Sequence, residues 1–273
     1  MGINATILEW FGFLYECGAL KGLESVLELG PQDLFFPADV LHSEVMKRIG
    51  SDGEAVFRGI LNHDATHSDR QALFYSMYGI FNYASVDSYD NRATYQQDLN
   101  IAVVAPSKFD LIVDCGTNEH VFNVANVFVY THNSLADGGV VLKVLPTFGD
   151  NTHGFYNIHP TVYFDVARVN GYEIIDFRYV DDMISRDSSR GAASLFDRRE
   201  LELRLHSFAG CASIQEEVSR NFLRILEKQA QAGQLANAHN AVDYCFVAMR
   251  KVRSEPFRYP GQGVYLTEFA GTS

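Results

Sequence analysis

The chain has 273 residues, with 22 Lys and Arg against 34 Asp and Glu, so its formal net charge at neutral pH is −12. An acidic surface repels a phosphate backbone, which argues against a nucleic-acid partner. Hydrophobic residues make up 47% and charged residues 21%, an ordinary globular composition, and no apolar run approaches the length that spans a membrane.

The cysteines and the first segment of the chain predict a cytoplasmic protein. The four cysteines are scattered without a CxxC pair, and isolated cysteines with apolar neighbours are usually reduced. The segment MGINATILEWFGFLYECG has no basic leader and carries Glu9 and Glu16, which is not typical of a signal peptide.

The first two predicted elements are a helix and a strand. Residues 3–22 place apolar side chains at near-helical spacing, which predicts an amphipathic helix. Residues 26–29 predict a short buried strand that ends at Gly30 and Pro31. Because Glu28 is acidic and a glycine lets a ligand approach the backbone, this strand end suits a nucleotide-type ligand. Without a full glycine-rich fingerprint, it is equally typical of a strand that simply turns.

A helical region and a second strand follow. Residues 34–80 are predominantly helical, and His63 and His67 within them are interpreted as solvated because no third metal ligand has a matching spacing. Residues 83–87 predict a strand that ends at Asp87. An acid at this position of a doubly wound fold accepts hydrogen bonds from both hydroxyls of a ribose.

Asp98 precedes a short apolar run at residues 101–104. Its carboxylate is placed either to accept a hydrogen bond from the exocyclic amine of an adenine or to close a turn. The sequence leaves both interpretations open.

The most informative stretch is residues 109–146, FDLIVDCGTNEHVFNVANVFVYTHNSLADGGVVLKVLP. It begins with a buried strand and continues through polar residues at 114–120 into a helix that Gly138 and Gly139 close. A second buried strand follows at residues 140–144. Such a strand–helix–strand unit places its polar loop at the carboxyl edge of a parallel sheet, where ligands bind.

Beyond residue 160 the pattern predicts one helix and two strands, at residues 161–170, 171–177 and 244–250. Gly171 ends the helix as a left-handed cap. Residues 181–240 are predicted to form a variable loop and helix. No repeat or linker divides the chain, so we predict one domain over residues 1–273 with a helical insertion at residues 34–80.

Taken in order, these segments resemble a class I S-adenosylmethionine-dependent methyltransferase. VLELGPQD resembles the first motif of that family, SVDSYD the second, QDLN the third and FDLIVDCGTNEHVFN the fourth, and LADGGVVLKVLP resembles its helix-to-strand turn. HGFYNIHPTVYFDVARVNGYEI resembles a bacterial subset of small-molecule methyltransferases. The resemblance covers roughly residues 24–178, about half of the chain.

The resemblance implies a Rossmann-like, doubly wound α/β sheet, mostly parallel with an antiparallel last strand and with the helical insertion after the first strand. It also implies S-adenosyl-L-methionine as the cofactor. In this family the first-strand acid orients the loop and the methionine ammonium, the second-strand acid binds the ribose, and the third motif meets the adenine. The implied cofactor-binding residues are Glu28, Gly30, Gln32, Asp87, Asp98, Leu99, Asp114, Cys115 and Gly116.

The acceptor side of this site is expected after residue 118. Methyl transfer needs an in-line nucleophile, and a hydroxyl or amine acceptor often also needs a base. His120 is the first candidate base, because histidine titrates near neutral pH. Glu119 is the second, or it orients His120; alternatively, His120 only packs on or caps the next helix. A small polar acceptor, such as a sugar or hydroxylated metabolite, is expected to contact His153, Tyr156, Asn157 and His159.

Glu119, His120, His153 and His159 are also residue types that bind a divalent metal ion. Their spacing matches no known ligand pattern, so no metal is predicted.

Two departures from the family keep an alternative function open. The first motif has one glycine where the family usually has two or three, and Gly30 is far from Asp87 in the sequence. The long interval predicts a lid or an oligomer contact in a homo-oligomer. The degenerate motif leaves open a catalytically inactive S-adenosylmethionine-binding or scaffold protein of the same fold.

Two other enzyme classes fit less well. A nicotinamide-dependent oxidoreductase lacks support because no GxGxxG follows the first strand. A nucleic-acid methyltransferase is disfavoured by the acidic charge and by the absence of an Asn/Asp-Pro-Pro-aromatic motif after Val113.

Overall fold

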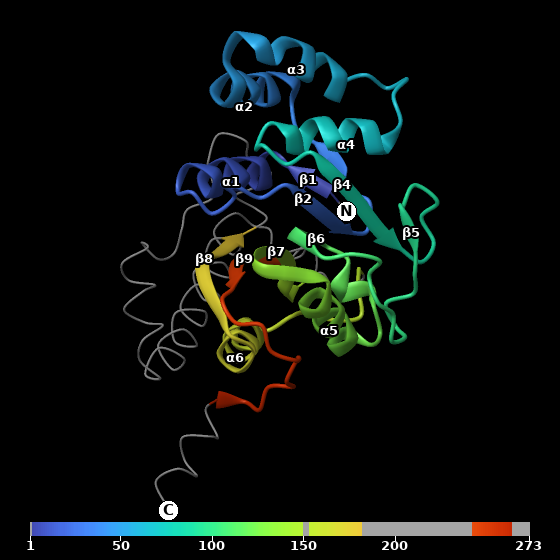
Figure 1. Cartoon of the computed structure of the whole chain (residues 1–273), viewed down its shortest axis with the longest axis vertical. Coiled ribbons are helices and arrows are strands. Elements are labelled where there is room, and N and C mark those ends of the chain that lie inside the picture. Colours follow the sequence, from blue (N-terminus) through green and yellow to red (C-terminus); the bar gives the residue numbers. More distant parts are fainter. Residues whose placement is uncertain (1, 150–152, 182–241, 264–273) are drawn as a thin grey trace, which may run out of the picture.

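A seven-stranded sheet forms the centre of the protein, and the computed structural model describes residues 2–149, 153–181 and 242–263. Its strands in chain order are β2 (Ser25–Leu29), β4 (Asn82–Asp87), β5 (Tyr95–Gln96), β6 (Phe109–Cys115), β7 (Leu135–Gly149), β8 (Tyr172–Asp181) and β9 (Val242–Lys251). They lie in the order β5-β4-β2-β6-β7-β9-β8 (Figure 1). Neighbouring pairs from β5 to β7 are parallel, whereas β9 is antiparallel to both β7 and β8. This arrangement confirms the predicted α/β, Rossmann-like fold with an antiparallel last strand.

Helices cover both faces of the sheet. They are α1 (Ala5–Glu16), α2 (Ala38–Ile49), α3 (Glu54–Ile60), α4 (His67–Ser76), α5 (Val124–Ser134) and α6 (Pro160–Asn170), with short 3-10 turns η1 (Gly50–Gly53) and η2 (Asn118–His120). Side chains of α1 and α4 pack in one core cluster, and those of α5 and α6 pack in a second cluster on the opposite face (Figure 1). A separate pair of parallel strands, β1 (Gly2–Asn4) and β3 (Asp33–Phe35), flanks the start of α1. Within the described residues, no helix combines the length and apolar content needed to cross a membrane.

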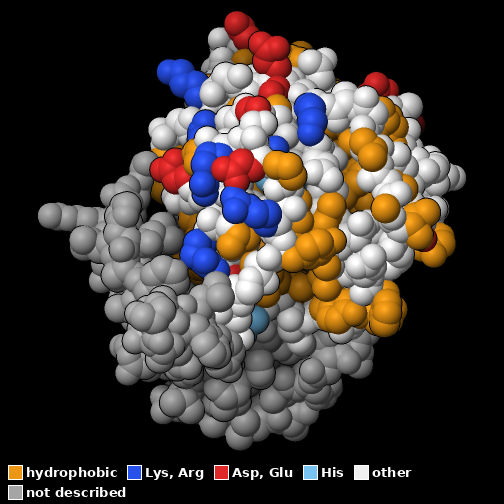
Figure 2. Space-filling model, turned by 60° about the horizontal axis from the view of Figure 1, so that its bottom comes forward, with side chains coloured by type: hydrophobic (Ala, Val, Ile, Leu, Met, Phe, Trp, Pro, Cys, Tyr) orange, Lys and Arg blue, Asp and Glu red, His pale blue; other side chains and the backbone are white. Residues whose placement is uncertain are grey.

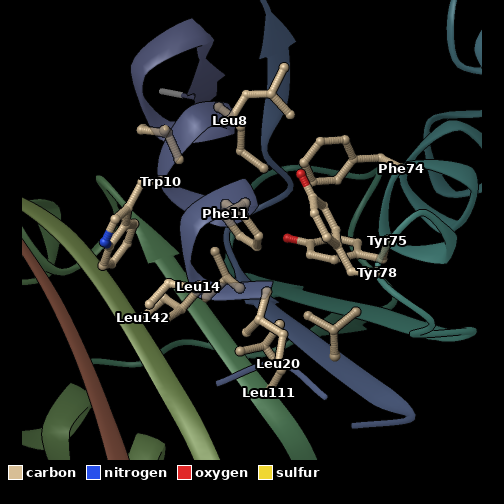
Figure 3. Packing of buried hydrophobic residues seen from close by; sticks show 14 of the residues in the cluster. Leu8, Trp10, Phe11, Leu14, Leu20, Phe74, Tyr75, Tyr78, Leu111 and Leu142 are labelled. Atoms are coloured by element: carbon tan, nitrogen blue, oxygen red, sulfur yellow. The ribbon is translucent and has the colours of Figure 1, made fainter. Parts of the chain in front are cut away.

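The central strands are apolar along nearly their whole length because both of their faces are buried. On β6, Leu111 and Val113 belong to the cluster of α1 and α4, whereas Ile112 belongs to the cluster of α5 and α6. Figure 3 shows Phe11 of α1 lying between the aromatic side chains of α4 and the sheet. Because alternate side chains enter two apolar clusters, each strand is a continuous apolar run in the sequence, and this run makes the strand predictable.

Helix α1 is fixed at both of its ends and on two sides. Asn4 caps its first turn, since its Oδ1 atom accepts a hydrogen bond from the Ile7 amide at 2.9 Å. The buried indole of Trp10 donates to Asp176 Oδ2 of β8 at 2.6 Å. Arg48 of α2 donates to the Gly12 carbonyl at 3.2 Å and pairs with Glu16 of α1. The helices that follow β3 are therefore docked on α1 by a polar contact as well as by apolar packing.

The region between β2 and β4 contains β3, α2, η1, α3 and α4. Its proposed role as a lid or an oligomer contact stays a prediction. The predicted loop and helix at residues 181–240 lie outside the described residues from residue 182 onward.

One boundary differs from the prediction. The helix expected to continue to Gly138 and Gly139 ends at Ser134, and Leu135 already pairs with Phe109 as part of β7. The two glycines lie instead in an irregularity of β7, where Gly138 has φ +79° and a Cβ atom on Gly139 would lie 2.9 Å from the Asp110 carbonyl oxygen. Glycine is required there for a close approach of two strands, and not for a helix cap.

Candidate functional site

The carboxyl ends of β2, β4 and β6 meet at one edge of the sheet. Gly30 follows β2 with φ +70°, and its amide donates to the Val86 carbonyl of β4 at 2.8 Å. A Cβ atom at Gly30 would lie 2.5 Å from Thr117 Oγ1, which follows β6, and 3.6 Å from Asp87 Oδ2 at the end of β4. Three strand ends are thus in contact around one glycine, and only glycine combines this backbone conformation with this spacing.

Gln32 holds the loop after β2 in place. Its side chain is buried, and its Nε2 atom donates to the carbonyls of Leu29 and Gly30 at 2.9 and 3.0 Å. Its own carbonyl accepts a hydrogen bond from Gln71 of α4. These contacts make Gln32 a residue that shapes the loop beneath the predicted cofactor position.

Glu28 is completely buried, and both of its carboxylate oxygens accept hydrogen bonds. The Gln32 amide and the Tyr83 hydroxyl donate to Oε2 at 2.9 and 2.7 Å, and the Tyr75 hydroxyl donates to Oε1 at 2.8 Å. Burial raises the pKa of this carboxyl to about 7, against the opposing effect of the three donors. The bond to the Gln32 amide gives Glu28 the expected position for orienting the loop; its contact with a methionine ammonium stays a prediction.

Asp87 is half-buried and is held by its own loop. Its Oδ1 atom accepts hydrogen bonds from the amides of Tyr89 and Asp90 at 2.7 and 2.9 Å, while Oδ2 lies on the side of Gly30. One oxygen therefore fixes the rotamer and the other points toward the meeting place of the strand ends. Its contact with a ribose stays a prediction.

Asp98 and Leu99, the residues predicted to meet an adenine, make contacts within the protein. Asp98 Oδ1 accepts hydrogen bonds from the backbone amide and the side chain of Asn100 at 2.8 and 2.9 Å, so Asp98 closes a turn. Leu99 is buried in the core against α5, and its carbonyl accepts a hydrogen bond from Asn126 at 2.7 Å. Their contacts with an adenine stay predictions.

Asp114 and Lys143 form a buried ion pair between β6 and β7. The two residues are direct partners in the strand register, with Asp114 Oδ2 and Lys143 Nζ 2.7 Å apart and both side chains at most 1% exposed. Asp114 Oδ1 accepts hydrogen bonds from the amides of Thr117 and Asn118 at 3.1 and 3.2 Å. The Asp114 side chain therefore shapes the loop that follows it.

Cys115 and Gly116 present their backbone to this edge. The Cys115 thiol is buried in the core on the α1 face, and burial raises its pKa well above the ordinary value. Gly116 has φ +94°, which turns the chain sharply out of β6. Of these two residues, only main-chain groups are placed to meet a ligand.

Glu119, His120 and His153 lie together beside this loop. The two Nε2 atoms of His120 and His153 are 3.1 Å apart, and Glu119 Oε1 is 3.9 Å from His120 Nε2. Glu119 is fully buried, whereas both histidines are exposed. The structure thus brings together residues that are 33 positions apart in the sequence.

The other residues expected to contact the acceptor are Tyr156, Asn157 and His159. Tyr156 lies near the cluster, and its hydroxyl donates to the Phe122 carbonyl at 2.8 Å. His159 caps α6, because its Nδ1 atom accepts a hydrogen bond from the Thr161 amide at 3.3 Å, and burial lowers its pKa. Asn157 is exposed between them. His159 is therefore engaged in a helix cap, apart from the pair of histidines.

Four residues at this edge were not predicted. Thr117 donates to the Leu29 carbonyl at 2.5 Å, and Asn118 is buried with no partner for its side-chain atoms among the described residues. Phe122 and Phe155 are 69% and 66% exposed, and their ring centroids are 5.8 Å apart. The repeated His-x-Phe spacing, in HVF and HGF, is the one sequence signal that points to the phenylalanines.

Figure 2 shows that hydrophobic side chains gather on one side of the face it presents.

No family model and no curated protein matches this chain. Among solved structures, many of those that match are S-adenosylmethionine-dependent methyltransferases. One, from Galdieria sulphuraria, is assigned as a sarcosine dimethylglycine methyltransferase, with 13% identity, coverage of 90% of this chain and 85% of that chain, and a TM-score of 0.43.

Two further structures contain a cofactor product. Phosphoethanolamine N-methyltransferase 2 from Haemonchus contortus, with S-adenosylhomocysteine, is 16% identical over 89% of this chain and 53% of that chain, with a TM-score of 0.42. The O-methyltransferase of a trans-AT PKS multienzyme from Brevibacillus brevis, with S-adenosylhomocysteine, is 13% identical over 92% and 80%, with a TM-score of 0.37. At these values the likeness does not extend to function, which has to come from the residues of this chain.

The buried ion pair generates a first prediction. Lys143→Met leaves the Asp114 carboxylate buried without its cation, so we expect the free energy of unfolding to fall by about 3–5 kcal/mol. Asp114→Asn combined with Lys143→Met removes both charges and is expected to cost less than Lys143→Met alone. Urea denaturation measures each value, with Lys21→Met at an exposed site as the control. Equal losses in the single and the double variant would contradict a charge-based role.

The raised pKa of Glu28 generates a second prediction. Because the carboxyl binds its proton more tightly in the folded than in the unfolded chain, its contribution to stability is present at low pH. That contribution is lost as the pH rises through about 7. A shift from 4.5 to about 7 corresponds to about 3 kcal/mol. We expect Glu28→Gln to flatten the decline of the unfolding free energy between pH 5 and 8, measured by urea denaturation at each pH. An unchanged slope would refute the assignment.

Proposed function

We propose that this chain is an S-adenosylmethionine-dependent methyltransferase that transfers a methyl group to an oxygen or nitrogen atom of a small polar metabolite. The observation that carries the proposal is the contact of Gly30, Asp87 and Thr117 at the carboxyl edge of three parallel strands. A glycine with positive φ, a ribose-type carboxylate and a polar loop are the groups that an adenosyl ligand requires there.

The cofactor is proposed to lie across this edge. Asp87 Oδ2 accepts hydrogen bonds from the ribose hydroxyls, since Oδ1 is already held by two backbone amides. The methionine end lies near Gly30 and Gly116, where the backbone turns with positive φ. Glu28 and Gln32 contribute indirectly, because their hydrogen bonds hold the loop after β2 on which the methionine end is proposed to lie.

The acceptor is proposed to bind beside His120 and His153. These exposed imidazoles, the hydroxyl of Tyr156 and the rings of Phe122 and Phe155 offer polar contacts next to apolar surface. A small polar metabolite with some apolar surface, such as a sugar or a hydroxylated compound, suits this combination.

The reaction is an in-line displacement at the methyl carbon. A lone pair of the acceptor forms the new bond to carbon, the bond from carbon to sulfur breaks, and its electrons remain on sulfur as S-adenosylhomocysteine forms. The acceptor also loses a proton, and His120 is the candidate group that receives it, with Glu119 beside it at 3.9 Å. The chain's main contribution is to position the two reactants.

Binding of S-adenosylhomocysteine to the full chain tests the cofactor site. Isothermal titration is expected to give saturable heat for the wild-type chain. Asp87→Asn replaces one acceptor oxygen by a donor, so we expect binding at least about tenfold weaker. Asp52→Asn removes the same charge from an exposed turn and serves as the matched control with unchanged affinity. Absence of saturable heat in the wild type, or equal affinity in both variants, would refute the cofactor assignment.

The acceptor side has its own test. His120→Ala is expected to lower the formation of S-adenosylhomocysteine from S-adenosylmethionine by about 10²- to 10⁴-fold. The assay uses a panel of small hydroxylated and amino metabolites as acceptors. Affinity for S-adenosylhomocysteine should stay close to that of the wild type, because His120 is not proposed to contact the cofactor. Full turnover in this variant would exclude His120 from the reaction.

A further inference from the structure

We propose that Glu119, His120 and His153 hold a divalent transition-metal ion. Each residue offers one ligand atom, and these atoms lie within 4.8 Å of one another among the described residues. Whether the ion binds is independent of the proposed function. Its role in activating the acceptor rests on that function.

The measured separations fit a shared ion. Two ligand atoms that are each about 2.0–2.2 Å from one metal cannot be more than about 4.4 Å apart. The Nε2 atoms of His120 and His153 are 3.1 Å apart, and His120 Nε2 is 3.9 Å from Glu119 Oε1. The three ligand atoms together spread over up to 4.8 Å, slightly beyond that limit, and a small rotation of the exposed His153 side chain brings them within it.

The charges of the cluster also favour a cation. The Nε2 atoms of the two rings face each other at 3.1 Å, so a divalent ion between them can bind a lone pair of each ring. The buried Glu119 carboxylate, with its Oε1 atom 3.9 Å from His120 Nε2, brings a negative charge to the same side.

The backbone holds the two halves of the cluster together. The amides of Phe155 and Tyr156 donate to the Glu119 carbonyl at 2.8 and 3.3 Å. A Cβ atom at Gly154 would lie 2.8 Å from Glu119 Cγ, so glycine permits this close approach. His153 is therefore fixed against Glu119 and His120 by main-chain contacts, which position the ligands before an ion arrives.

The ligand set indicates the kind of ion and its chemistry. Two imidazoles and one carboxylate suit Zn²⁺, Mn²⁺ or Fe²⁺ better than Mg²⁺ or Ca²⁺, which prefer oxygen ligands. Three protein ligands leave coordination positions open, as in catalytic metal sites. Because both histidines are exposed, an acceptor oxygen can bind there, and the ion lowers the pKa of its hydroxyl so that the proton leaves to water. With the ion bound, Nε2 of His120 is a ligand and cannot accept the proton, so the base role proposed for His120 applies to the metal-free chain.

Titration of the full chain with Zn²⁺, after removal of metal by EDTA, tests the site. Isothermal titration is expected to give one saturating equivalent. Residues that only orient a metal ligand contribute about 10- to 100-fold to metal affinity. Loss of a ligand itself should cost at least as much, so His153→Ala and Glu119→Gln are each expected to weaken Zn²⁺ binding by more than tenfold. His63→Ala, at an exposed histidine outside the cluster, is the matched control. Equal Zn²⁺ affinity in wild type and His153→Ala, or a loss in His63→Ala alone, would overturn the proposal.

A second measurement separates the ion from the proposed function. S-adenosylhomocysteine is titrated into the metal-free chain and into each variant, where unchanged affinity shows that the fold and the cofactor site are intact. Co²⁺ is then added as a spectroscopic probe, and its visible absorption is expected to change when an acceptor of the panel is added. Metal binding without cofactor binding would refute only the proposed function. Cofactor binding without metal binding would refute only this inference.

Discussion

The ion pair between Asp114 and Lys143 is the contact on which the functional edge of this protein depends. It joins two central strands at a place where neither charge meets water. A buried pair of this kind adds little net stability, because desolvation of both charges offsets their attraction. What the pair does provide is a fixed orientation of the Asp114 carboxylate. The second oxygen of Asp114 accepts hydrogen bonds from the amides of Thr117 and Asn118, so the same side chain holds the start of the loop after β6.

The two halves of the proposed site follow from that conformation. Thr117 reaches back to the Leu29 carbonyl and comes so close to Gly30 that no side chain fits between them. One residue further along, Asn118 begins the short turn that carries Glu119 and His120. A single loop therefore closes the cofactor side on β2 and presents the acceptor side to residues 153–156. If the proposed methyl transfer takes place here, this loop positions both reactants, which is the main requirement of that reaction.

The sequence predicted the sheet well because the central strands are buried on both faces and their apolar runs are unambiguous. It also predicted which strand ends carry Glu28 and Asp87, since a strand's last residues are read directly from the end of the run. The predicted end of α5 was wrong. Gly138 and Gly139 resemble a helix cap in the sequence, but in the structure they lie at an irregularity of β7.

The contacts that position the site residues join segments far apart in the sequence, so they produce no periodic pattern from which they could be predicted. Tyr75 and Tyr83 as donors to Glu28, Lys143 as the partner of Asp114, and the approach of His153 to His120 all join segments far apart in the chain. His159 illustrates the reverse case. The sequence predicted an acceptor contact for it, which stays a prediction; the structure adds that His159 caps α6, a role indicated by Pro160 at the first helical position.

The treatment of buried carboxylates links these observations to the proposed reaction. A sulfonium loses its positive charge as the methyl group leaves, so bare carboxylates near sulfur would stabilise the reactant more than the transition state. Asp114 is neutralised by Lys143, and burial brings the pKa of Glu28 to about 7 while three donors surround it. Glu119 lies beside two imidazoles that an ion can join to it. Asp87, half-buried at the end of β4, keeps one carboxylate oxygen on the side of Gly30, where the proposed function places the cofactor. The proposed reaction therefore fits an edge whose fully buried carboxylates are paired, surrounded by hydrogen-bond donors or next to imidazoles.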